Sequence, residues 1–163
     1  MANTTRNLLL AGVVANALLV GAAGDQVIKQ LPARRSVGVL AYTAFSQAAD
    51  LRRGLFWYVS LGVVWTALNV AAAVAGWVDG ASGGRGAALG VLVAAVAGHV
   101  VLTGFAAPTL WSQRAAAGDE TALRRVFDRF ERLQLIRLGL DIAAVAAAVW
   151  ALAATVTNRA RSG

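Results

Sequence analysis

The sequence predicts an all-α integral membrane protein, a four-helix bundle that crosses the bilayer four times. Hydrophobic residues make up 58% of the 163 residues and charged residues only 14%, which lies outside the usual composition of soluble domains. Apolar stretches of about 20 residues, the length that spans a bilayer as a helix, occur four times between polar breaks. We expect one membrane domain, 1–163, with spans near 7–30, 54–78, 87–107 and 134–156.

Prolines, glycines and small residues refine this outline. We expect Pro32 and Pro108 to limit the first and third spans, because proline cannot donate a helical hydrogen bond. The glycine-rich segment 80–86 should form a short turn between the second and third spans. Small residues spaced by four allow membrane helices to approach closely. They occur at Gly90, Ala94 and Gly98, and at Ala143, Ala147 and Ala151.

Both long connections carry helical patterns of their own. Segment 37–53 places apolar and polar residues on opposite faces, which predicts an amphipathic helix along the membrane surface. The apolar face contains Val37, Leu40, Ala41, Ala44, Phe45, Ala48 and Leu51, and the polar face contains Thr43, Ser46, Gln47 and Asp50. Asp119 should cap a second helix, 119–133, whose apolar stripe continues into the fourth span. We expect this helix to extend the fourth span into the cytoplasm.

The basic residues predict the orientation in the cell membrane. The two long connections carry Lys29, Arg34, Arg35, Arg52 and Arg53, and Arg114, Arg124, Arg125, Arg129 and Arg132. The termini and the short turn carry only Arg6, Arg85, Arg159 and Arg161. The positive-inside rule therefore places both long connections in the cytoplasm and both termini outside. Positive charge follows the first apolar run more than it precedes it, so we expect a retained span and not a cleaved signal peptide.

Composition also limits the chemistry and the partners. The chain has no cysteine and one histidine, which excludes thiolate metal sites, iron–sulfur clusters, bis-histidine haem and two-histidine iron sites. It contains no phosphate-binding loop, dinucleotide fingerprint or nucleophile elbow. We therefore predict no cofactor and no bound metal. The net charge of +7 is assigned to membrane lipids as partners and not to nucleic acid, because the basic residues flank apolar spans.

Polar residues inside the spans are the candidate functional residues, because such residues are costly in a membrane. Helical spacing places them on one face of each span, so they should line a polar, aromatic bundle interior. They are Asn16 on the first span, Tyr58, Trp65 and Asn69 on the second, His99 and Thr103 on the third, and Gln134, Arg137 and Asp141 on the fourth, with Asp25, Gln26, Lys29 and Gln30 at the cytoplasmic end of the first. Counted from the cytoplasmic boundary, His99 and Asp141 lie at comparable depth, where they could meet.

Each candidate also has a structural interpretation, which the sequence leaves open. His99 is compatible with an ordinary interhelical hydrogen bond. Arg137 and Asp141, one turn apart, are compatible with an ion pair within the helix. Asn16 and Asn69 are compatible with amide contacts that join two helices.

Three further segments carry a family resemblance. They are Leu31-Pro32 after the first span, Pro108 at the end of the third, and FDRFERLQLIR at 127–137. In these segments, and in a layout that covers nearly the whole chain, the sequence resembles the anthrone-oxygenase-like family of small four-helix membrane proteins, most of which have no known function. It departs from the family pattern at Gln134, where Asn or His is usual, and at Thr109-Leu110, where a polar Asn is usual.

The resemblance implies oxidation of a polyketide anthrone to an anthraquinone by molecular oxygen, without an obvious cofactor. In this hypothesis His99 is the base that removes the acidic methylene proton. Asp141 or Asn69 orients its imidazole, and Arg137 stabilises the developing enolate. These are the predicted catalytic residues.

The predicted substrate-binding residues are Trp65 and Tyr58, which could sandwich a flat substrate, with Asn69, Thr103 and Asn16. The alternative is a non-catalytic bundle that binds a lipid or a hydrophobic small molecule, or that holds a protein partner on its basic cytoplasmic helices. A homo-oligomer is compatible with both hypotheses.

Overall fold

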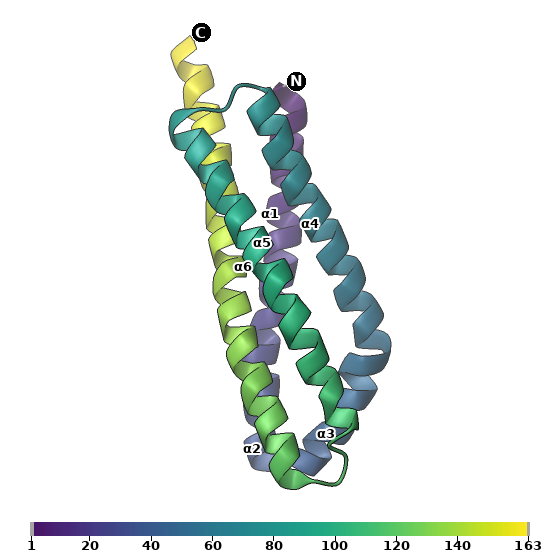
Figure 1. Ribbon diagram of the computed structural model, residues 1–163. Helices are drawn as coiled ribbons and strands as arrows, with labels where there is room; N and C mark the ends of the chain where they lie inside the picture. The colour runs from purple at the N-terminus through teal and green to yellow at the C-terminus, as the bar shows by residue number, and fades with distance from the viewer. Residues whose placement is uncertain (1, 163) are drawn as a thin grey trace.

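The computed structural model describes residues 2–162, with Ala2 and 156–162 described as helix without side chains. Four long helices form a bundle: α1 (Ala2–Asp25), α4 (Gly54–Val78), α5 (Gly83–Trp111) and α6 (Glu120–Ser162). Both termini lie at one end, and the short helices α2 and α3 lie at the other (Figure 1). We call the end with α2 and α3 the basic end. The prediction of orientation from the basic residues also included Arg159 and Arg161, whose side chains lie outside the described residues.

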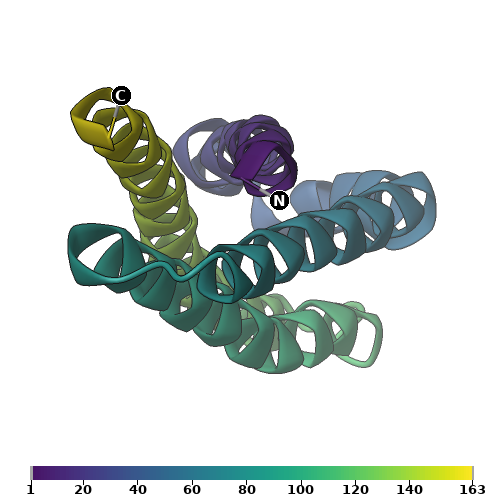
Figure 2. The ribbon, with the colours of Figure 1, turned by 90° about the horizontal axis from the view of Figure 1, so that it is seen from above.

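The helices follow one another around the bundle in the order α1, α4, α5, α6, with α1 and α5 diagonal to each other (Figure 2). Each lies in an apolar helical run that is long enough to cross a membrane. Large apolar side chains remain exposed on every helix, among them Leu18, Val63, Val101 and Ile142. An apolar outer surface on all four helices is what a bilayer requires. The structure thus supports the predicted multi-pass membrane bundle.

The interior contains two apolar clusters, and buried polar side chains reach into the larger one. The larger cluster is formed by the four long helices and includes Leu9, Trp65, Leu92 and Ala144. The smaller lies at the basic end, where α2 and α3 meet α5 and α6, and it includes Phe127. Its members also include Leu31, Val39, Tyr42, Ala106, Leu123 and Phe130. The second cluster fixes the helical connections to the bundle.

Helix α6 is one continuous helix of 43 residues, about 64 Å long. Gly118 precedes it with φ +85°, and Asp119 Oδ1 accepts a hydrogen bond of 2.9 Å from the backbone N–H of Ala122. This is the geometry of the predicted helix cap. The segment 119–133 therefore joins the fourth span without a break.

Neither proline ends its helix, contrary to the prediction. Pro108 lies inside α5, which continues to Trp111. Pro32 is the second residue of α2 (Leu31–Val37), which follows α1 through a π-helical turn, η1 (Gln26–Gln30). In this turn the backbone N–H of Leu31 bonds to the carbonyl of Gln26, five residues back. A register shift beside the proline accommodates its missing N–H group and keeps the chain helical.

The glycine-rich segment turns earlier than predicted. Gly80 and Gly83 have φ +75° and +55°, which favours glycine, and α5 begins at Gly83 and not near residue 87. The small-residue pattern is used in part. A Cβ on Gly98 would lie 3.0 Å from Leu140 Cδ1, so α5 and α6 approach closely there, whereas Gly90 has open space around it.

The connection 37–53 is helical, and its inward face is mixed, because it buries Val39, Tyr42 and Leu51 as well as polar side chains. Helix α3 (Val39–Ala48) and the π-helical turn η2 (Ala49–Arg53) lead into α4. Thr43, Ser46 and Asp50, on the predicted polar face, are buried against the bundle, while Leu40 and Phe45, on the apolar face, are about half exposed. Gln113, in the 3-10 turn η3 (Ser112–Arg114), donates a hydrogen bond of 3.3 Å to Ser46 Oγ.

Candidate functional site: an intramembrane polar network

Buried polar side chains from all four long helices meet in the bundle interior. We call them the polar network: Asn16 from α1, Trp65 and Asn69 from α4, His99 from α5, and Gln134, Arg137 and Asp141 from α6, with Gln26 from η1. All of these except Arg137, which is half-buried, have side chains largely hidden from solvent. Eight polar or amphipathic residues in the bundle interior are costly in a membrane protein, unless they bond to one another.

His99 and Asp141 form the centre of the network. His99 is 5% exposed and Asp141 1% exposed, and His99 Nδ1 lies 2.6 Å from Asp141 Oδ1. The residues that immediately precede them, Gly98 and Leu140, are the pair that makes the close contact between α5 and α6. The absent side chain at Gly98 therefore lets the helices approach where His99 and Asp141 must meet.

Arg137 occupies the other nitrogen of the imidazole. Its Nη2 lies 3.1 Å from His99 Nε2. A guanidinium only donates hydrogen bonds, so Nε2 accepts, and we assign a neutral imidazole whose proton on Nδ1 is donated to Asp141. The ion pair between Arg137 and Asp141 is not formed among the described contacts. His99 stands between the two charges because it offers each of them a hydrogen bond.

The network continues from Arg137 towards the basic end. Arg137 Nη1 donates to Gln134 Oε1 at 2.5 Å, and Gln134 Nε2 donates to Gln26 Oε1. The sequence indicated Gln26 as a polar residue at the end of the first span, but it was not predicted to be catalytic or substrate-binding.

Trp65 connects the histidine to a pair of asparagines. Its ring centroid lies 4.7 Å from that of His99, with a tilt of 48° between the planes, and its indole N–H donates to Asn16 Oδ1. Asn16 and Asn69 exchange side-chain hydrogen bonds of 3.2 Å in both directions, and Asn69 also donates to the backbone carbonyl of Trp65 at 2.8 Å. The asparagines thus fix the indole orientation as well as joining α1 to α4.

Two atoms at the centre have no hydrogen-bond partner among the described residues. They are Asp141 Oδ2 and Arg137 Nε, and both are buried. A buried polar atom without a hydrogen-bond partner is costly. The site therefore retains capacity for one additional polar group.

The remaining predicted site residues stand apart from this chemistry. The Thr103 hydroxyl donates to the backbone carbonyl of His99 at 2.8 Å, one turn along α5. Tyr58 is half-buried and precedes Trp65 by seven residues, about 10 Å along the helix. It takes no part in the hydrogen bonds described for the network, and the ring contact with His99 is made by Trp65. The predicted stacking of Tyr58 on a substrate stays a prediction.

Two surface pockets lie outside the network. One, of about 450 Å³, lies between α5 and α6 at the basic end, and its lining includes Pro108 and Arg129. The other, of about 510 Å³, is mostly apolar and lies between α1 and α4 near the termini, where its lining includes Thr5 and Val74. His99 lines neither of them. His99 itself is buried, with 5% of its surface exposed.

No family model, curated protein or solved structure matches this chain. The functional argument therefore depends on the site itself.

Proposed function

We propose that this chain is a membrane enzyme in which His99, oriented by Asp141, removes a proton from a flat, hydrophobic carbon acid that then reacts with molecular oxygen. The observation that carries the proposal is the 2.6 Å contact between His99 Nδ1 and Asp141 Oδ1. A carboxylate that holds one imidazole nitrogen leaves the other as the base, which is the common arrangement of histidine bases. The substrate class comes from the resemblance to anthrone oxygenases.

In the resting arrangement the basic nitrogen is blocked. Arg137 holds His99 Nε2 at 3.1 Å, so a substrate must first displace the guanidinium. A substrate carbonyl oxygen is a suitable acceptor for it, because carbonyl oxygens accept the hydrogen bonds that guanidinium groups donate. Binding of the carbonyl to Arg137 would thus release the lone pair of Nε2 for catalysis.

The reaction then follows from the exposed nitrogen. Nε2 takes a methylene proton of the anthrone, and the negative charge is delocalised onto the oxygen beside Arg137. The carbanionic carbon transfers electrons to O₂ and forms a C–O bond, and His99 returns its proton to the resulting peroxide. Loss of water forms the second carbonyl. The balance is one anthrone and one O₂ to one anthraquinone and one H₂O.

The aromatic side chain next to the base suits a planar substrate. The Trp65 ring lies 4.7 Å from the His99 ring, and offset aromatic stacking operates at this separation. In this proposal Asn16 and Asn69 act by holding Trp65 and do not contact the substrate, since their amides bond to the indole, the backbone and each other. Thr103 and Tyr58 are left as candidate contacts along the entry route.

The test is oxygen uptake by the detergent-purified full-length chain with anthrone, together with quinone absorbance. We expect uptake and quinone formation with the wild type, and background values with His99→Ala and Asp141→Asn. Asp25→Asn is the matched control, because the Asp25 carboxylate pairs with Lys29 on the outside of the same bundle. Background uptake by a folded wild-type protein, or equal activity in the His99 variant, would refute the proposal.

A second function is favoured by the closure of the network. Because His99 is buried and both of its nitrogens are bonded, the same contacts can serve a non-catalytic bundle that binds a lipid or hydrophobic small molecule. In that case, native mass spectrometry of the purified protein should show a copurified small molecule. His99→Ala should then lower stability without loss of the bound molecule.

We also propose that the basic end faces the cytoplasm of the cell and that both termini lie outside. The support is the concentration of Arg and Lys at the end with α2 and α3 and the positive-inside rule. The chain has no cysteine, so single-cysteine variants are specific probes. A cysteine at Arg124 should resist a membrane-impermeant maleimide in intact cells, and labelling there would reverse the proposed orientation.

A further inference from the structure

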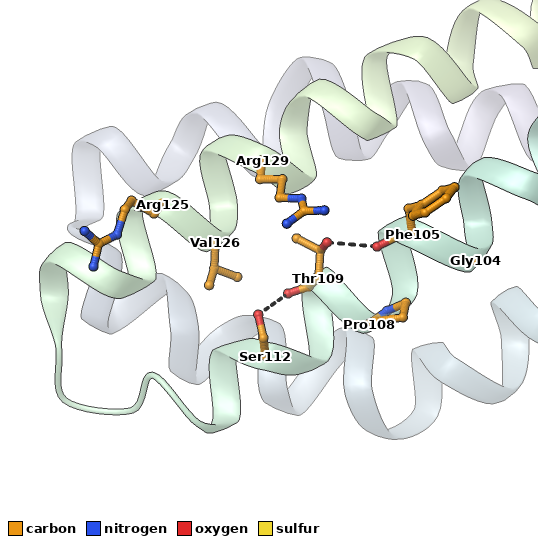
Figure 3. A pocket seen from close by; sticks show the side chains of 8 residues that line it. All are labelled: Gly104, Phe105, Pro108, Thr109, Ser112, Arg125, Val126 and Arg129. Carbon is orange, nitrogen blue, oxygen red and sulfur yellow. Dashed lines mark hydrogen bonds between the residues drawn. The ribbon is translucent and has the colours of Figure 1, made fainter.

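The pocket at the basic end combines positive charge with an apolar wall. It lies between the C-terminal part of α5 and the first turns of α6 (Figure 3). Arg129 extends across it towards Thr109, and Arg125 lies one turn nearer the α5–α6 connection (Figure 3). Its lining residues are Gly104, Phe105, Pro108, Thr109, Ser112, Arg125, Val126 and Arg129.

The two arginines have no acidic partner among the described residues, and the acids of their own helix are bound elsewhere. Glu120 pairs with Arg124. Asp128 and Glu131 both pair with the buried Arg34, at 2.7 and 2.5 Å. The hydroxyl of Thr109 donates to a backbone carbonyl of its own helix. The pocket therefore presents two exposed cations that lack a counter-charge.

We propose that this pocket binds the phosphate group of an anionic phospholipid. Guanidinium groups are well suited to phosphate oxygens, and basic pockets between membrane helices are established geometries for anionic headgroups. The inference is independent of the oxygenase proposal, because no member of the polar network lines this pocket.

The apolar surface beside the pocket favours a lipid over free phosphate. Phe105 in the pocket wall and Val101, one turn further towards the centre of α5, are 55% and 60% exposed. Ile136 is also exposed on α6, two turns towards the centre from Arg129. Since Gly98 faces Leu140, antiparallel counting places Val101 near Ile136. A headgroup at Arg129 would thus have its acyl chain along an apolar strip.

The experiment is native mass spectrometry of the detergent-purified full-length chain, titrated with phosphatidylglycerol, phosphatidylcholine or inorganic phosphate. We expect wild type to bind phosphatidylglycerol in preference to phosphatidylcholine, and an excess of phosphate not to displace it. Each arginine near an anionic lipid surface contributes about fivefold in affinity, so Arg125→Gln with Arg129→Gln should weaken binding about thirtyfold.

The matched control is Arg114→Gln with Arg132→Gln. It removes the same charge from exposed arginines that do not line the pocket, and we expect less than threefold weakening. Equal weakening in both double variants would overturn the proposal in favour of diffuse attraction. Equal affinity for phosphatidylcholine, or displacement by phosphate alone, would overturn it as well. Arg125→Lys with Arg129→Lys keeps the charge and should retain most of the binding.

Discussion

The charges of Asp141 and Arg137 should be energetically coupled through His99, although they do not touch. Two hydrogen bonds, of 2.6 and 3.1 Å, and the width of the imidazole place the charges about 8 Å apart, which corresponds to about 2 kcal/mol at an effective dielectric constant of about 20. Asp141→Asn retains an acceptor for the histidine proton and removes only the charge. It leaves the Arg137 guanidinium without its counter-charge inside the bundle.

The assay is a double-mutant cycle of Asp141→Asn and Arg137→Gln. The free energy of unfolding of each variant is measured in mixed detergent micelles from the loss of helical circular dichroism. We expect each single variant to lower the free energy of unfolding by about 2–3 kcal/mol, and the double variant to lose about 2 kcal/mol less than their sum. Asp25→Asn with Lys29→Gln, an exposed pair on one helix turn, should show no resolvable coupling. Additivity of the Asp141 and Arg137 effects within about 0.5 kcal/mol would refute this electrostatic account.

Three further predictions follow from local contacts. Gly54→Ala should lower the melting temperature, because its Cβ would lie 2.4 Å from a backbone carbonyl in the π-helical turn, whereas Gly62→Ala, with open space around it, should not. Arg34→Gln should lower the free energy of unfolding by about 2 kcal/mol, because Asp128 and Glu131 lose the buried guanidinium that binds both carboxylates. Arg35→Gln, at an exposed position, should have less than half that effect in the same detergent titration. A spin label on Phe45→Cys should be relaxed by lipid-soluble oxygen more than by a water-soluble nickel complex, and equal relaxation would place α3 in water.

The sequence was most informative where the membrane imposes a strict rule. Polar side chains must turn away from lipid, so helical spacing alone placed Trp65, Asn69, His99 and Asp141 in the interior, and their contacts join three of the four long helices. Depth counting also placed His99 and Asp141 within reach of each other. Whether these residues are catalytic stays a prediction, because a contact is compatible with either function.

The sequence was less informative where tertiary contacts compete with local ones. The spacing of Arg137 and Asp141 suits an ion pair within one helix, but His99 on a neighbouring helix bonds to both side chains and separates them. Pro32 suits a helix end, but the π-helical turn before it supplies an alternative register. Both outcomes depend on what surrounds the residue, and helical spacing contains no information about this.

The orientation of α3 shows that an amphipathic pattern identifies two faces but not the solvent of each. In water the apolar face would pack inwards. Here Ser46 is fully buried with Val39 and Tyr42, and it bonds to Asp50 Oδ2 at 2.8 Å, while Leu40 and Phe45 are about half exposed. Turning polar side chains inwards and apolar side chains outwards stabilises a helix only if its outer face lies against lipid. In water this arrangement would lose the hydrophobic stabilisation that comes from burying Leu40 and Phe45. We therefore infer that lipid, and not water, covers the outer face of α3.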